Sequence, residues 1–308
     1  MDKHVLTLIV SRVITSLKDI ANLRLVSKFF NKTLSDPMVW QHFPPFDVQS
    51  NIDVIINNRE HFSWYHGLLT VKPHECHVGQ IAKLAKQYRI HADLSQSGVV
   101  DVSMLGDVHT LDLAFTKVRD VSALTHVHTL DLYNTRVKDV SALTHVHTLN
   151  LNHTCVRDVS ALTHVHTLNI AGLRVFDVSM LGNVHTLNLS YTPVVDVSAL
   201  ANVHTLNLSY TKVVDVSALT RVHTLDLSYT EVVDVSALTS VHTLYLAHTK
   251  VVDVSALGHV HTLDLGYTEV ADVSALGNLD TLILTRTKVV DISAVMNVRN
   301  LRMTTDIF

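Results

Sequence analysis

The sequence has few of the features that mark a secreted, membrane-bound or nucleic-acid-binding protein. Cys76 and Cys155 are its only cysteines, too few for a disulfide framework. No uninterrupted apolar stretch approaches the roughly 20 residues that a membrane span needs. A formal net charge of -4 provides no general attraction to nucleic acid. We therefore expect a soluble cytoplasmic protein with neither a membrane nor a nucleic-acid partner.

The amino-terminal stretch also lacks the pattern of a secretory signal. Residues Val5–Val10 are mostly apolar, but Asp2 precedes them and no small-residue cleavage site follows. The sequence contains no nucleotide-binding loop, no metal cage and no unique nucleophile constellation. We expect neither enzyme activity nor a cofactor.

What the sequence does have is a motif, Asp-Val-Ser-Ala-Leu or a close variant, that recurs every nineteen residues. Its copies start at Asp101, Asp120, Asp139, Asp158, Asp177, Asp196, Asp215, Asp234, Asp253, Asp272 and Asp291. A unit this short cannot enclose a core of its own, so neighbouring copies must stack and bury each other's apolar faces. The repeat predicts a solenoid over residues 89–308.

One repeat shows how this solenoid is expected to be built. Its apolar residues include Val108, Leu111, Leu113 and Val118, and the alternation at 111 and 113 predicts a short strand. The pattern resembles the leucine-rich repeat, L-x-x-L-x-L-x-x-N-x-L, with Thr116 at the asparagine position, and the resemblance covers about two thirds of the chain. It implies one parallel sheet of about twelve strands in an α/β protein, with short non-helical convex returns like those of internalin-type repeats.

Threonine and aspartate recur at positions that predict a structural role. The threonine hydroxyls can satisfy buried backbone groups of the turn after each strand. The aspartate that opens each motif is expected to accept backbone N–H groups one or two residues onward. Leu173 interrupts the threonine series beside Gly172, which predicts a local irregularity there.

Nine histidines recur in register, at positions 109, 128, 147, 166, 185, 204, 223, 242 and 261. Catalysis requires one asymmetric constellation, and a residue copied this often does not provide it. Open histidine pairs also lack the closed tetrahedral set of a zinc site. We expect a structural row in which neighbouring imidazoles lower each other's pKa.

The first 43 residues predict three short helices. Ser16-Leu-Lys-Asp19 matches a capping box for the second helix, and Asp36-Pro37 is typical of the start of the third. The run Leu23-Arg-Leu-Val-Ser-Lys-Phe-Phe-Asn31, followed by Asp36-Pro37 and Trp40, resembles an F-box. The resemblance implies docking to a Skp-type adaptor of a cullin-RING ubiquitin ligase. The residues it assigns to this contact are Val5, Leu6, Ile9, Leu17, Ile20, Leu23, Val26, Ser27 and Trp40.

This match departs from the family pattern at its beginning. Met1-Asp2 stands where the F-box has Leu-Pro, and His4 stands where it has an acidic residue, so part of the usual adaptor contact is absent. A generic three-helix cap for the solenoid is the alternative interpretation.

Residues 44–88 are predicted to form a helical connector and cap, with an amphipathic helix at 81–88. Its cluster of His74, Cys76 and His77 has no second ligand pair at zinc-finger spacing, so we expect no metal. The predicted domains are therefore an F-box-like unit at 1–43, this connector, and the solenoid at 89–308.

Positions at which the repeats differ are expected to decide recognition. One row beyond the strands is largely aromatic and includes Tyr191, Tyr210, Tyr229 and Tyr267. Exposed aromatic residues suit partner contact, although stacking for stability explains the row equally well. The sequence leaves both interpretations, partner contact and stacking, open.

Charge divides the repeats as well. The early flank carries Lys117, Arg119, Arg136, Lys138, Arg157 and Arg174, with no opposite charge in the row. The later flank alternates as Lys212, Glu231, Lys250, Glu269 and Lys288, beside an apolar row of Val195, Val214, Val233, Val252 and Val290. The early flank predicts an acidic or phosphorylated partner segment, with a solvated basic face as the alternative, and the valines suggest an accessory or self-association surface.

Together these predictions describe a non-enzymatic protein-interaction adaptor, the substrate receptor of an SCF-type cullin-RING ubiquitin ligase. The alternative is a leucine-rich-repeat recognition scaffold unconnected to ubiquitin. Near-identical repeats joined to an F-box resemble the repeat proteins of large DNA viruses of amoebae. On that resemblance, the cytoplasm would be that of a host.

Overall fold

The computed structural model describes residues 46–47, 68–71 and 78–303. The chain divides into two compact units, Met1–Asp131 and Leu132–Phe308. The predicted F-box-like helices of residues 1–43 lie outside the described residues, as do His74, Cys76 and His77.

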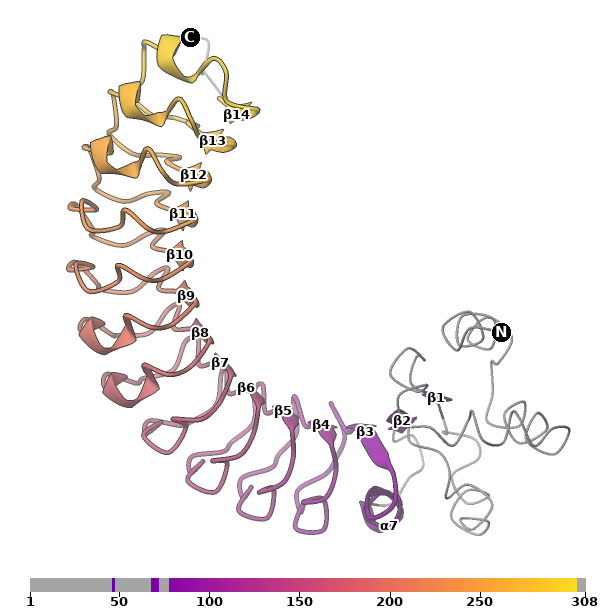
Figure 1. The fold of residues 1–308 in the computed structure, drawn as a ribbon. Helices are drawn as coiled ribbons and strands as arrows, with labels where there is room; N and C mark the ends of the chain where they lie inside the picture. The colour runs from indigo at the N-terminus through magenta and orange to yellow at the C-terminus, as the bar shows by residue number, and fades with distance from the viewer. Residues whose placement is uncertain (1–45, 48–67, 72–77, 304–308) are drawn as a thin grey trace, which may run out of the picture. The chain divides into compact units, whose positions relative to one another are not determined.

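In its described residues the first unit contains a parallel sheet and one helix. Its elements are β1 (Phe46–Asp47), β2 (Leu68–Val71), α7 (Val78–Ala85), β3 (Arg89–Asp93), β4 (Thr110–Asp112) and β5 (Thr129–Asp131), and each strand pairs in parallel with the next. Helix α7 buries Ile81, Ala82 and Leu84 and lies beside β3 (Figure 1).

The sheet of this unit begins before residue 89, which corrects the prediction of a wholly helical connector. Leu69 pairs with Ile90, and Val71 pairs with Ala92. All four side chains are buried, so Leu68–Val71 continues the inward alternation of the repeats without their motif. The helix of the connector is also earlier than predicted, at Val78–Ala85 rather than 81–88.

The second unit continues the same architecture with nine parallel strands. They are β6 (Thr148–Asn150), β7 (Thr167–Asn169), β8 (Thr186–Asn188), β9 (Thr205–Asn207), β10 (Thr224–Asp226), β11 (Thr243–Tyr245), β12 (Thr262–Asp264), β13 (Thr281–Ile283) and β14 (Asn300–Arg302). Register is constant, since Thr pairs with Thr and Leu with Leu from β6 to β13. Strands β3 to β14 correspond to the predicted twelve.

Each repeat contributes one layer of a continuous aliphatic core. In the repeat of β9, Leu206, Leu208, Val213, Leu219 and Val222 are each no more than 1% exposed. Burying one such side chain contributes about 1.5–3 kcal/mol, and each one packs against its counterparts in the adjacent repeats. The stack is therefore stabilised mainly between repeats rather than within them.

The returns between strands are short, as predicted, but not entirely non-helical. Single 3₁₀ turns occur at η1 (Ser179–Leu181), η2 (Ser198–Leu200), η3 (Ser255–Leu257), η4 (Ser274–Leu276) and η5 (Ser293–Val295). Figure 1 shows some of these turns on the side of the second unit opposite its strands. The few residues available for the return leave room for one such turn and no α-helix.

The recurring threonines have the predicted structural role. The Oγ1 of Thr211 donates a hydrogen bond of 2.6 Å to the carbonyl of Leu208, and the same bond recurs in the other repeats that carry this threonine. At Leu173 the predicted irregularity is wrong. The Leu173 N–H still donates to Ile170 O at 3.2 Å, and its side chain is buried, so only the hydroxyl bond is lost.

The motif aspartates are the predicted turn caps. Asp120 accepts the Ser122 N–H at 2.9 Å through Oδ1, and Asp215 does the same for Ser217. This hydrogen bond, with a second one from the serine hydroxyl, holds the pKa of Asp120 below its ordinary value. These carboxylates therefore have a structural role in the turns.

Candidate functional site

The predicted adaptor-binding residues, from Val5 to Trp40, lie outside the described residues. The surfaces of the repeats therefore supply the candidate site. Among the described residues no group of three or more His, Cys, Asp or Glu side chains is arranged to hold a metal ion. None of the described helices is long and apolar enough to cross a membrane.

The aromatic row is formed by a backbone conformation that the sequence analysis missed. Tyr191, Tyr210, Tyr229, His248 and Tyr267 all have φ between 57° and 59°, a left-handed conformation uncommon outside glycine. Each of these residues donates its N–H to a carbonyl of the next repeat, as Tyr191 does to Ser209 O at 3.0 Å. Gly172 occupies the same position at φ 70°, which gives this glycine its structural role.

The rings of this row stack on one another. Centroid distances are 4.3 Å for Tyr191 and Tyr210, and 4.2 Å for each successive pair from Tyr210 to Tyr267. Hydrogen bonding between the hydroxyls of Tyr210 and Tyr229 raises the pKa of Tyr210. The stacking interpretation is thus confirmed, while partner contact through the exposed ring edges stays a prediction.

All six side chains of the early basic flank are exposed. Lys117 and Arg119 belong to the first unit, whereas Arg136, Lys138, Arg157 and Arg174 belong to the second. In the described part of the chain none of these six side chains forms an ion pair. Four uncompensated cations therefore lie on the first three turns of the second unit.

The later flank contains two ion pairs, as its alternation of charge predicted. Lys250 forms an ion pair with Glu231, and Lys288 Nζ lies 2.6 Å from Glu269 Oε2. All four side chains remain more than half exposed, so each pair contributes only roughly 0.2–1 kcal/mol.

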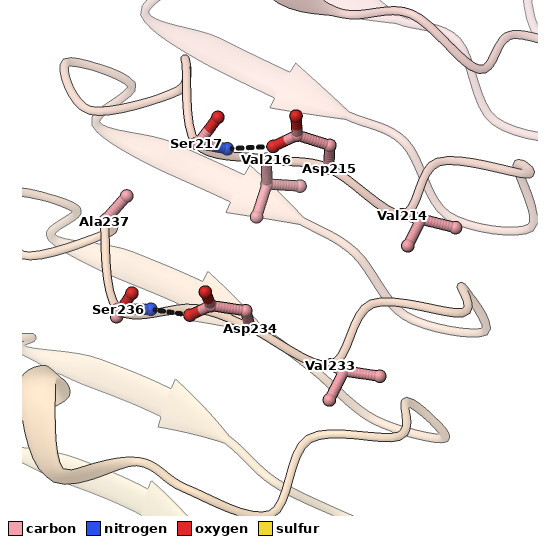
Figure 2. Close-up of a pocket in the computed structure, with 8 residues that line it drawn as sticks. All are labelled: Val214, Asp215, Val216, Ser217, Val233, Asp234, Ser236 and Ala237. Atoms are coloured by element: carbon pink, nitrogen blue, oxygen red, sulfur yellow. Dashed lines mark hydrogen bonds between the residues drawn. The ribbon is translucent and has the colours of Figure 1, made fainter.

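The valine row borders a series of shallow pockets on the returns. Val195, Val214, Val233 and Val252 are 54–57% exposed. One pocket of about 280 Å³ lies between Val214 and Val233, and Figure 2 shows that its polar lining is the capped pairs Asp215–Ser217 and Asp234–Ser236. Similar pockets follow in the next repeats. The carboxylates of the first pocket accept backbone hydrogen bonds through Oδ1 and so stabilise the returns.

The histidine row is a stack of imidazoles. In the second unit, successive rings from His147 to His204 lie 4.6 Å apart and nearly parallel, and each Nδ1 lies 3.3–3.4 Å from the Oγ1 of the next threonine. His223 differs, with its ring edge-on to both neighbours and its Nδ1 buried without a partner in the described part of the chain.

The pKa is lowered, as predicted, at two of the histidines, but burial and not the neighbouring imidazoles is the largest cause. Burial, with smaller contributions from Arg89 and His128, lowers the pKa of His109 to about 4. The pKa of His185 is lowered by burial and by its neighbours His166 and His204. The folded chain therefore favours the neutral form of His109 and His185.

This architecture is that of the leucine-rich-repeat proteins. An internalin (inlF) from Listeria monocytogenes is similar in structure, with a TM-score of 0.67 and 19% identity over 85% of this chain and 95% of the internalin. The functional domain of InlJ from Listeria monocytogenes has a TM-score of 0.58 and 22% identity over 73% of this chain and 54% of that one. The APL1 leucine-rich-repeat domain has a TM-score of 0.55 and 15% identity over 84% and 86%.

These similarities establish the fold alone. No protein-family model matches the sequence, and comparison with curated proteins gives no match either. The F-box resemblance of residues 1–43 therefore rests on the match of Leu23–Asn31, Asp36-Pro37 and Trp40.

Proposed function

We propose that this protein is a non-enzymatic protein-interaction adaptor. The observation that carries the proposal is a division of labour within each repeat. The recurring Thr and Asp side chains are used in hydrogen bonds of the framework, and the side chains that vary between repeats are the exposed ones. A rigid framework that displays variable exposed side chains suits recognition of another macromolecule.

More specifically, the protein acts as the substrate receptor of an SCF-type cullin-RING ubiquitin ligase in the cytoplasm, that of a host if the protein is viral. The support is the F-box resemblance of Leu23–Asn31, Asp36-Pro37 and Trp40 in a chain that carries repeats over residues 89–308. A Skp-type adaptor would bind residues 5–43, and the repeats would hold the target.

The alternative is a recognition scaffold unconnected to ubiquitin. The observation that favours it is the departure from the F-box pattern at Met1-Asp2 and His4. The two functions differ in whether the amino-terminal residues bind the adaptor.

Co-purification of the full chain with a Skp adaptor distinguishes them. Retention by the unmodified chain and loss in an Ile9→Asp, Leu23→Asp variant are expected for the receptor. A variant with Val195→Asp and Val214→Asp is the matched control, because it places the same charges on exposed positions of the repeats, and it should retain the adaptor. No retention by the unmodified chain would leave the scaffold.

The target is expected to present an acidic or phosphorylated segment to the early basic flank. Lys138, Arg157 and Arg174 of the second unit are exposed and unpaired, so changing them to Glu should abolish capture of a phosphorylated acidic peptide. The matched control changes Lys212, Arg221 and Lys250 to Glu, which alters the net charge equally on later repeats. Equal loss in both variants would reject the early flank as the binding surface.

A further inference from the structure

One strand of the second unit departs from a column that its neighbours share. The third strand residue is Asn or Asp in β6 to β10 and again in β12, whereas β11 has Tyr245. Its neighbours in the column are half-buried, and Tyr245 is 36% exposed. A large aromatic side chain therefore interrupts the run of Asn and Asp from β6 to β12, which is followed by Ile283 in β13 and Arg302 in β14.

This departure removes a hydrogen bond from the framework. Asn207 Oδ1 accepts the Ser209 N–H at 2.9 Å, and Asp226 and Asp264 accept the equivalent N–H groups in their repeats. Tyr245 carries no acceptor at that position, and the Ala247 N–H makes no such bond within the described residues. A residue that breaks a local structural rule without a structural gain marks a candidate functional position.

Two carboxylates flank this ring. Register places Asp226 on one side of Tyr245 and Asp264 on the other. Each uses Oδ1 in its turn, which leaves Oδ2 for another partner, and neither forms an ion pair within the described residues. Burial raises the pKa of Asp264, the expected result for a carboxylate that lacks a counter-charge.

The neighbouring side chains leave the ring accessible. Two residues beyond this column the chain has Ser190, Ser209 and Ser228 after β8, β9 and β10, but Ala247 after β11 and Gly266 after β12. A cation–π contact elsewhere in the chain shows the kind of group that binds to an exposed tyrosine ring. The guanidinium carbon of Arg286 lies 5.6 Å from the ring centroid of Tyr267. Cations prefer the face of an aromatic ring, and flanking carboxylates strengthen that preference.

We propose that Tyr245, Asp226 and Asp264 form a docking site for arginine or lysine side chains of an extended, basic protein segment. The two carboxylates lie two strand spacings apart, roughly 10 Å, which matches side chains three residues apart on one face of a polyproline II segment. The site rests on the adaptor role proposed above and adds a second contact, opposite in charge to the early basic flank.

The test is a binding titration on the full chain. The probe is a short fluorescein-labelled peptide with arginine at every third position in a glycine–serine background, followed by fluorescence anisotropy. The same peptide with citrulline in place of arginine keeps the shape and removes the charge, and it should bind at least about tenfold more weakly.

Three variants test the residues. The pair Asp226→Asn, Asp264→Asn keeps both turn bonds, as Asn207 does in its own repeat, and should weaken binding of the arginine peptide about tenfold. The pair Asp215→Asn, Asp234→Asn removes the same charge from the returns and should change binding less than about twofold. Tyr245→Asp restores the missing turn bond and adds a carboxylate, yet should weaken binding about fivefold because the ring is lost.

Each outcome bears on the site. Equal losses in the two asparagine pairs, or undiminished binding by Tyr245→Asp, would show general attraction to negative charge and overturn the proposal. Absence of arginine-peptide binding at about 1 mM would also overturn it. Because adaptor co-purification is measured separately, loss of this site leaves the proposed adaptor role intact, and failure of that role would appear in co-purification.

Discussion

Residues 136–174 and 191–290 of the second unit differ in their exposed side chains, although strands β6 to β13 share one register. The early repeats carry unpaired Arg and Lys side chains, and the later ones carry ion pairs and a stack of tyrosines. The buried core and the strand register, which the two regions share, therefore stabilise both of them. On the proposed function, recognition depends on the exposed side chains that differ between them.

The largest expected effect should be the same in both regions. Leu149 in the early part and Leu206 in the later part are each 1% exposed. Changing either to Ala should lower the free energy of unfolding by about 2–5 kcal/mol, because a core methylene cluster is lost and a cavity remains. Urea titration of both variants checks this. A loss confined to one of them would show that the two regions do not share one core.

Acid should destabilise the folded chain through His109 and His185, which lie outside both regions. Because the folded-state pKa values of His109 and His185 are lowered, the unfolded chain binds more protons below pH 6.5. Stability is then fully present above pH 6.5 and is lost as pH falls toward the folded value, about 4 for His109. The urea midpoint should be lower at pH 5.5 than at 7.5, and equal midpoints would contradict the prediction.

A His185→Gln variant serves as the control for this effect. It removes one titrating ring from the stack, and its midpoint should depend less on pH than that of the unmodified chain. The motif aspartates do not confuse the comparison, because their pKa values are lowered and they titrate below this window.

The smallest expected effect separates the two regions. Lys250→Met removes one exposed ion pair and should cost less than about 1 kcal/mol, with the loss fading at high salt. Arg157→Met removes an unpaired cation and should cost nothing or stabilise the chain slightly. Thermal unfolding of both variants at low and high salt is the measurement. An equal loss of stability in the two variants would mean that Arg157 also has a stabilising partner, which the charge pattern of the sequence does not predict.

Much of the fold was predictable because the period leaves little choice. Strands, threonine bonds and aspartate caps follow from short-range rules and recur identically, so one repeat determines the rest. The early strands β1 and β2 were missed because only Leu69 and Val71 preserve the inward alternation there, without the motif. At Leu173 the error was to treat a lost hydroxyl as a break in the backbone, although the bonding of its N–H and the buried core were sufficient to keep the turn.

The candidate site was predictable only in part. The charge difference between regions was visible in the sequence, and the pairing of Lys250 with Glu231 follows from it. The left-handed backbone under the tyrosines was not, because a residue of this kind rarely adopts positive φ and is held there by a hydrogen bond to the next repeat. Tyr245 was not among the predicted site residues, because most of the strands carry Asn or Asp at its position.

The nineteen-residue period by itself determined the solenoid, its core positions and the capping roles of Thr and Asp, because these depend on spacing and on bonds within a few residues. Tertiary structure alone decided which exposed side chains meet, since stacking of Tyr191 on Tyr210 and the placement of Asp226 and Asp264 beside Tyr245 depend on register between repeats. Register converts residues nineteen positions apart into neighbours roughly 5 Å apart, and that proximity creates surfaces that no single repeat contains.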